Sequence, residues 1–119
     1  MIRLLMLTSF ANSCRQIIST TAAMSLKSVD FEVFGRVQGV FFRKFTKDQA
    51  NKLGLRGWCK NTHEGTVLGH IQGPSEKIES MMHWLKTTGS PSSNIDKAEF
   101  RNHKDITEYS FDNFSILRD

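Results

Sequence analysis

The stretch Gly35-Arg36-Val37-Gln38-Gly39-Val40-Phe41-Phe42-Arg43 joins two different hydrophobic patterns and so decides how the chain folds. Before it, apolar residues alternate with polar ones, which predicts a half-buried strand from about Leu26 to Phe34. After it, residues recur at helical spacing, which predicts a helix that ends near Leu53. The alternating residues are Val29, Phe31 and Val33, and the helical ones are Phe42, Phe45, Gln49, Ala50 and Leu53. The stretch is therefore predicted to be a strand-to-helix turn.

The residue types in this turn suit an anion. Gly35 and Gly39 permit backbone angles that point successive N–H groups into one concavity. The start of a helix adds unpaired N–H groups and a partial positive charge. Arg43, in the first helical turn, carries a planar fork of donors that matches two phosphate oxygens. The pattern favours a phosphate cradle, and the alternative is a simple turn followed by a solvated arginine. Walker loops and glycine-triplet dinucleotide loops are excluded by the glycine spacing.

The remaining elements follow in quick succession. Strands are predicted at Leu55–Asn61 and Thr66–Gln72, and the short connection between them predicts a hairpin. A second helix opens at Gly73-Pro74-Ser75 and ends before Gly89 and Pro91. Two further strands are predicted, one around Ala98–His103 and one at Tyr109–Leu117. This order predicts an α+β, ferredoxin-like split βαβ sandwich with a C-terminal strand added, in which two helices cover one face of an antiparallel sheet.

Length and charge narrow the function. A chain of 119 residues is enough for one domain, and its net charge is +4. Residues 1–23 hold two arginines and no acid, so the balance from Met24 onward is fourteen basic against twelve acidic residues. That mild excess suits an anionic small molecule and gives little reason to expect a nucleic-acid partner.

Residues 1–23 differ from the rest and are expected to be a leader or flexible extension, with residues 24–119 forming the domain. They are rich in Ser and Thr, lack acids, and resemble a mitochondrial presequence. We expect a cytoplasmic domain, with mitochondrial import as the alternative. No stretch reaches the ~20 apolar residues of a membrane span, so no membrane partner is expected. Cys14 lies in the leader, which leaves Cys59 without a partner for a disulfide if the leader is removed.

A second stretch, Gly57-Trp58-Cys59-Lys60-Asn61-Thr62, ends on a residue with useful chemistry. The amide of Asn61 both donates and accepts hydrogen bonds, so it could hold a water without being protonated itself. The alternative is that Asn61 simply starts the hairpin turn, where Asn is common. The pattern leaves open whether Asn61 comes near the glycine loop.

Together the two stretches resemble the acylphosphatase family. The resemblance extends over residues 25–119 and includes GRVQGVFFR, GWCKNTHEGTV, IQGP, SMMHWL and GSPSSNID. It implies that the backbone of the loop binds the substrate phosphate, that Arg43 clamps the phosphate, and that Asn61 orients the attacking water. The loop residues are Gly35, Arg36, Val37, Gln38, Gly39, Val40, Phe41 and Phe42. Members often carry Cys at the position of Phe41.

The residue chemistry agrees with this resemblance. Neither stretch holds a histidine, carboxylate or thiol placed as general acid, base or nucleophile, and His63 and Glu64 fall at the predicted hairpin tip. A carboxylate leaving group needs no proton donor, because its conjugate acid has a pKa of about 4. We therefore expect metal-independent hydrolysis of acyl phosphates by a monomer that has no cofactor and no metal site.

Two other functions remain open. Ferredoxin-like sheets also serve as RNA-binding domains, but those display aromatic side chains on central strands, and Thr66–Gln72 has none. A regulatory domain that senses phosphorylated metabolites would bind phosphate in the same loop without turning it over.

Overall fold

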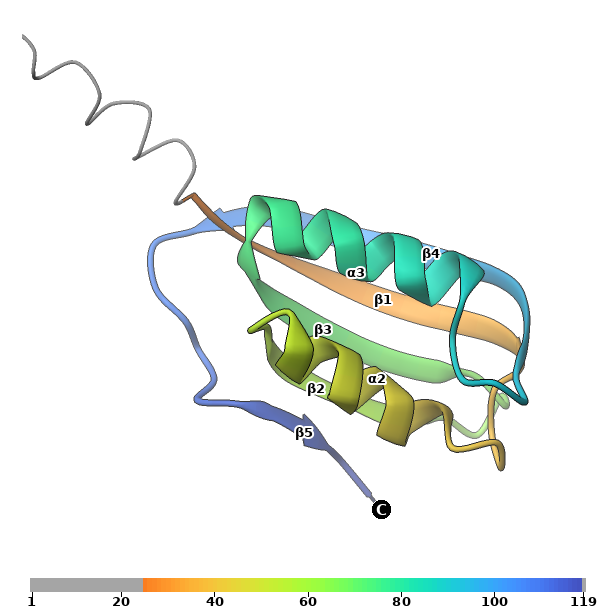
Figure 1. Cartoon of the computed structure of the whole chain (residues 1–119). Helices are drawn as coiled ribbons and strands as arrows, with labels where there is room; N and C mark the ends of the chain where they lie inside the picture. Colours follow the sequence, from red (N-terminus) through yellow and green to blue (C-terminus); the bar gives the residue numbers. More distant parts are fainter. Residues whose placement is uncertain (1–24, 119) are drawn as a thin grey trace, which may run out of the picture.

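The computed structural model describes residues 25–118, and the predictions made for residues 1–23 lie outside them. The described chain folds as two helices packed on one face of a five-stranded sheet (Figure 1). The elements in order are β1 (Leu26–Arg36), α2 (Phe42–Lys52), β2 (Arg56–Asn61), β3 (Val67–Pro74), α3 (Ser75–Thr87), β4 (Asn94–Ile106) and β5 (Phe114–Ile116). Within these residues neither helix is both long and apolar enough to span a membrane.

The sheet has the order β4-β1-β3-β2-β5, so the first strand of the chain is an interior strand with a neighbour on each side. β1 pairs antiparallel with both β3 and β4, and β2 pairs antiparallel with β3, which confirms the predicted hairpin. The predicted ferredoxin-like α+β fold is confirmed. The prediction of a purely antiparallel sheet needs a correction at one edge, since β5 runs parallel to β2.

The direction of β5 follows from the path of the chain after β4. β4 lies at the opposite edge, and the connection from it passes the end of the sheet where β3 ends and β2 begins (Figure 1). There the backbone N–H of Ser110 donates to Gln72 Oε1 over 2.8 Å, and the Arg56 guanidinium lies 3.7 Å from the centre of the Tyr109 ring. The chain then enters the edge of the sheet from the same end as β2, so the two strands are parallel.

The core lies between the sheet and the helices. The alternating residues of β1 are fully buried, as the sequence predicts, and they pack beneath Ile78, Met81 and Leu85 of α3. At the start of α2, Phe42 is buried with its ring centre 6.0 Å from that of Trp84. The same buried cluster includes Val37 and Val40, so the loop before α2 is anchored in the core.

Candidate active site

The loop between β1 and α2 presents unpaired backbone donors. Gly39 and Phe41 have left-handed backbone angles, with φ values of 74° and 61°, and these reversals curve the chain beside two buried anchors. The anchors are Val37 and Val40, which are 1% and 6% exposed. Among residues 25–118, no partner accepts a hydrogen bond from the backbone N–H groups of residues 37–41. A run of such donors at a helix N-terminus is a ready site for an anion.

The start of α2 adds further donors. The cap residue Phe41 makes no side-chain hydrogen bond to the helix, and the first turn contains no acidic residue that could neutralise it. The first N–H groups of an α-helix have no partner within the helix. The loop and the helix start therefore offer positive partial charge in one place, which is the arrangement that a phosphate cradle needs.

Gln38 fastens the loop to the β2–β3 hairpin. Its side-chain nitrogen donates to the carbonyl oxygens of Thr62 and Thr66, each over 2.9 Å. Because Thr62 directly follows Asn61, these two bonds set the distance between the loop and the end of β2. The sequence singled out Gln38 only as a loop residue, and the structure shows that its side chain joins two segments.

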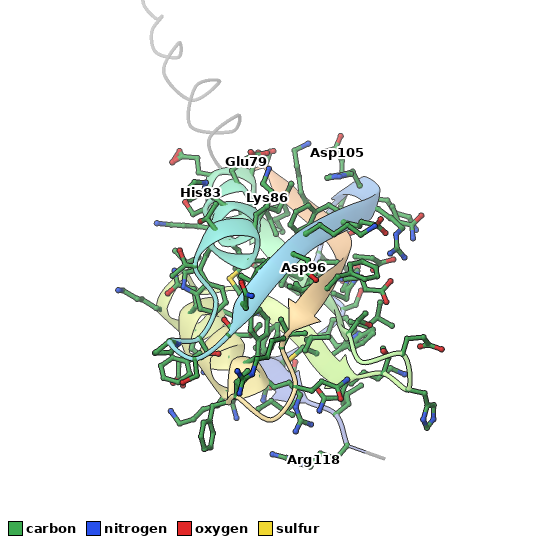
Figure 2. All side chains as sticks on the ribbon, turned by 90° about the vertical axis from the view of Figure 1, so that its right-hand side faces the viewer. Glu79, His83, Lys86, Asp96, Asp105 and Arg118 are labelled. Atoms are coloured by element: carbon green, nitrogen blue, oxygen red, sulfur yellow. The ribbon has the colours of Figure 1, made fainter. Side chains whose placement is uncertain are left out.

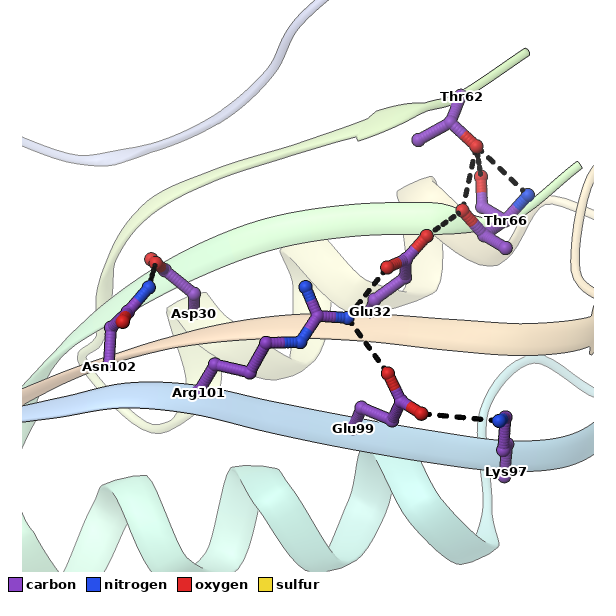
Figure 3. Close-up of polar contacts among 8 residues, drawn as sticks. All are labelled: Asp30, Glu32, Thr62, Thr66, Lys97, Glu99, Arg101 and Asn102. Atoms are coloured by element: carbon purple, nitrogen blue, oxygen red, sulfur yellow. Dashed lines mark hydrogen bonds and ion pairs between the residues drawn. The ribbon is translucent and has the colours of Figure 1, made fainter. Parts of the chain in front are cut away.

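The hairpin is in turn braced from the open face of the sheet (Figure 3). The Thr66 hydroxyl donates to Glu32 Oε2 over 2.7 Å, and it also lies 2.7 Å from the Thr62 hydroxyl. Arg101 Nη2 donates to Glu32 Oε1 over 2.7 Å and to Glu99 Oε1 over 2.9 Å. These charge-assisted bonds from Thr66 and Arg101 hold the pKa of Glu32 below its ordinary value. A continuous set of polar contacts thus links β4 to the loop.

A cavity of about 300 Å³ lies between the loop and the sheet edge. Arg43 and Asn61 both line it, so the two predicted site residues come together although eighteen positions separate them. Four of the eight predicted loop residues also line it: Val37, Gly39, Phe41 and Phe42. The other four do not, and three of these have different places: Arg36 is exposed, Val40 is buried and Gln38 holds the hairpin.

Gly35, the fourth of these residues, serves the close approach of two strands. A Cβ at this position would lie 2.2 Å from the carbonyl oxygen of Asn94, and the φ of Gly35 is +128°. Only glycine accommodates both the contact and the angle without a shift of β4.

Three residues that the sequence did not identify also line the cavity: Lys44, Ile116 and Arg118. Lys44 makes an ion pair with Asp48 over 2.9 Å. This cavity is distinct from a second one that Glu79 and Asp105 line. Figure 2 shows Arg118 at the lower end of the molecule and these two residues at the upper end. Alternation along the last strand could have placed Ile116 and Arg118 on one face, but nothing in the sequence shows which edge that strand joins.

Asn61 has an unused acceptor next to the loop. Its Oδ1 is buried and has no hydrogen-bond partner among the described residues, a condition it shares there with Ser90 Oγ. A buried polar atom without a partner costs free energy, so its presence calls for a ligand or water.

The prediction that His63 and Glu64 lie at the hairpin tip agrees with the exposure of both residues.

Cys59 lies beneath Arg43 but is not a nucleophile. Its Sγ lies 4.0 Å from the carbonyl oxygen of Arg43, and its side chain is fully buried. Burial raises the pKa of this thiol to about 12, and the nearby Arg43 charge offsets only part of the effect. The thiol therefore stays protonated at neutral pH and serves as packing.

Comparisons with known proteins show the family of the chain. The model of the acylphosphatase family matches residues 29–116. Human acylphosphatase-2 is 57% identical over 96 residues, which cover 81% of this chain and 97% of that protein. The acylphosphatase of Bacillus subtilis superposes with a TM-score of 0.71 at 32% identity, covering 77% of this chain and 99% of its own. That of Coxiella burnetii superposes with a TM-score of 0.68 at 29% identity, covering 78% and 94%. The chain therefore belongs to the acylphosphatase family.

Proposed function

We propose that the cavity between the glycine loop and β2 is where this chain breaks the carboxyl–phosphate bond, without a metal ion. The chain is an acylphosphatase, so it hydrolyses an acyl phosphate to a carboxylate and inorganic phosphate. The observation that carries the location is that Arg43 and Asn61 line one cavity together with the loop. The reaction needs an anion site, an oriented water and little else.

The phosphate binds to the loop backbone and to Arg43. The N–H groups of residues 37–41 donate to no described partner, and the helix start beside them has no acidic residue. Arg43 adds two parallel donors and a full positive charge to these partial charges. Such donors do not reorganise as negative charge shifts during phosphoryl transfer, and this lowers the barrier.

Asn61 orients the attacking water. Its buried Oδ1 can accept a hydrogen bond from that water, and its position is set by the contact of Gln38 with the neighbouring Thr62. An amide does not take up the proton, so a phosphate oxygen of the substrate accepts it as the water attacks phosphorus. The P–O bond to the acyl group lies opposite the attacking water. It breaks as the new P–O bond forms, and the carboxylate leaves with the bonding electron pair.

The lining of the cavity fits a mechanism that needs no general acid. It includes two arginines, one lysine and one asparagine, but no histidine, carboxylate or thiol. Among residues 25–118, no three His, Cys, Asp or Glu side chains are grouped so as to hold a metal ion. We assign the charge stabilisation to Arg43 and the backbone amides.

The test is hydrolysis of benzoyl phosphate by the full chain with excess chelator, alongside Arg43→Lys. We expect turnover to persist with chelator and to fall on the order of 10²-fold in Arg43→Lys, because an ammonium cannot make the two-pronged contact. Inhibition by inorganic phosphate should weaken in the same variant. Lys47→Met, which removes an exposed cation one helical turn away, is the matched control. Unchanged phosphate inhibition in Arg43→Lys would place the anion elsewhere.

We also propose an oligomeric state, a domain boundary and a cellular compartment for this chain. The proposed reaction assigns no role to a second copy of the chain, and we propose that the protein acts as a monomer. The family match begins at residue 29, which supports a domain from residue 24 preceded by a leader or extension. We place the domain in the cytoplasm, with mitochondrial import as the alternative. Imaging of the full chain beside a chain that lacks residues 1–23 distinguishes the two compartments.

A further inference from the structure

Phe41 is placed where packing does not require an aromatic ring. Its residue surface is 72% exposed, and its backbone lies in the left-handed region, with φ 61° and ψ 24°. A bulky residue adopts that region at a cost, and an exposed ring gains little from the core. The neighbouring Phe42 is buried, so the chain directs one ring inward and the next toward solvent. Phe41 nevertheless lines the cavity that holds Arg43 and Asn61.

Ile116 provides a second apolar group in the same cavity. It is the register partner of Cys59 in the parallel β2–β5 pair, so the two side chains project on the same face of the sheet. Cys59 contacts the carbonyl oxygen of Arg43, which places this face beside the first turn of α2. Ile116 therefore lies next to the phosphate-binding groups, on a strand that reaches the site only through the tertiary fold.

The cavity is larger than a phosphate group needs. Its volume of about 300 Å³ is at the lower end of the range for small-molecule sites, about 300–1,000 Å³. The loop donors, Arg43 and Asn61 account for the phosphate and the water. The side chains of Phe41 and Ile116 have no role in those contacts, and the remaining part of the substrate is its acyl group.

We infer that Phe41 and Ile116 bind the acyl group of the substrate and favour aromatic or branched aliphatic acyl phosphates over small ones. Contact between two aromatic rings removes apolar surface from water and adds a geometric preference, which a methyl group cannot match. The effect is on binding and not on the bond-breaking step, since neither side chain touches the reacting atoms. It therefore changes KM for large acyl groups and leaves kcat unchanged.

The experiment compares benzoyl phosphate with acetyl phosphate in Phe41→Asn. Asparagine tolerates the left-handed backbone better than most residues, so this change removes the ring while keeping the loop conformation. We expect the ratio of the KM for benzoyl phosphate to the KM for acetyl phosphate to rise on the order of tenfold. The N–H of residue 41 belongs to the phosphate-binding loop, so a change in phosphate binding alone would affect both substrates alike and leave this ratio unaltered.

Leu117→Asn is the matched control. Leu117 is the other large hydrophobic residue exposed among residues 25–118, at 44%, but it does not line the cavity, and alternation after Ile116 turns it to the other face. The ratio of the KM values for benzoyl phosphate and acetyl phosphate should be the same in this variant as in the original chain. An equal rise in KM for both substrates in Phe41→Asn, or no change for either, would overturn the inferred role.

Because this role rests on the proposed function of the cavity, Arg43→Lys is measured in the same series. If Arg43→Lys loses phosphate inhibition while Phe41→Asn keeps its substrate preference, the phosphate site stands and the acyl site is wrong. If Arg43→Lys keeps phosphate inhibition, the location of the active site itself is wrong.

Discussion

The side-chain amide of Gln38 donates a 2.9 Å hydrogen bond to the carbonyl oxygen of Thr62, and this contact joins the two halves of the candidate site. One half is the loop that ends at Arg43, and the other is the end of β2 that carries Asn61. Neither half can bind a phosphate and orient a water without the other, so their separation has to be held constant.

Replacing Gln38 with Ala should therefore uncouple the two halves. We expect a loss of about 1–2 kcal/mol in the free energy of unfolding, because two carbonyl oxygens each lose one of their donors. Turnover of benzoyl phosphate should fall more than this loss of stability explains. Urea unfolding and kcat, measured on the same sample, provide the comparison. Thr62→Ser, which keeps the carbonyl oxygen and the hydroxyl, should leave both quantities close to their original values.

Replacing Asn61 with Ala should separate binding from chemistry. The amide oxygen is buried and has no partner among the described residues, so its assigned role is with the attacking water. We expect turnover to fall on the order of 10²–10³-fold, by analogy with the loss of one positioned polar group. Inhibition by inorganic phosphate should persist, since the loop and Arg43 remain. A parallel fall in turnover and phosphate affinity would contradict the role in orienting water.

Two alanine substitutions in the loop should lower the free energy of unfolding by different amounts. A Cβ at Gly39 meets nothing within 4 Å, so Gly39→Ala should lose only about 1 kcal/mol, the cost of a left-handed angle for a residue with a side chain. A Cβ at Gly35 would lie 2.2 Å from the Asn94 carbonyl oxygen, so Gly35→Ala should lose about 3 kcal/mol or more. Urea unfolding of the two variants measures the difference. Equal losses would mean that β4 can move away from Gly35.

The thiol of Cys59 should react only when the chain unfolds. Burial raises its pKa to about 12, so the reactive thiolate is scarce at pH 8 and the sulfur is shielded from reagents. Alkylation in a Cys14→Ser chain should be on the order of 10³-fold slower without urea than with it. The measurement is the rate of mass increase with iodoacetamide. Fast labelling of the folded chain would show that the region beneath Arg43 opens readily.

The contribution of Glu32 to stability should depend on pH. Bonds from Thr66 and Arg101 lower the pKa of Glu32 in the folded chain. A carboxylate of this kind stabilises the fold above its unfolded pKa of about 4.3, and the contribution disappears as the pH falls through the lower, folded value. Glu32→Gln should lower the free energy of unfolding at pH 7 by about 1–2 kcal/mol. The difference from the original chain should shrink below about pH 4.

The control for this pH dependence is Glu108→Gln, which removes an exposed carboxylate that makes no hydrogen bond or ion pair with another described residue. Unfolding of the three proteins in urea, at intervals from pH 7 to pH 3, provides the data. A difference between Glu32→Gln and the original chain that stays constant over this range would mean that the charge of Glu32 is not what stabilises the hairpin.

Local patterns in the sequence predicted most of the elements, because each depends on nearby residues. The alternation of Val29, Phe31 and Val33 identified β1, and the glycines bracketed the loop. The predicted boundaries were less accurate at the C-terminal end. β4 runs from Asn94 to Ile106 instead of Ala98 to His103, and β5 contains three residues where nine were predicted. Edge strands have few local signals, since one side of each lacks a partner.

The sequence by itself determined the fold class and the chemical character of the loop, because periodicity, glycine positions and residue types are local properties of the chain. The family followed from the resemblance of its motifs to those of known proteins. Only the tertiary structure decided that Asn61 lies beside Arg43, that Gln38 holds them together, and that β5 enters parallel to β2 and places Ile116 in the cavity. The physical reason is that these relationships arise from strand pairing and side-chain contacts between distant segments, and no spacing along the chain encodes the distance between them.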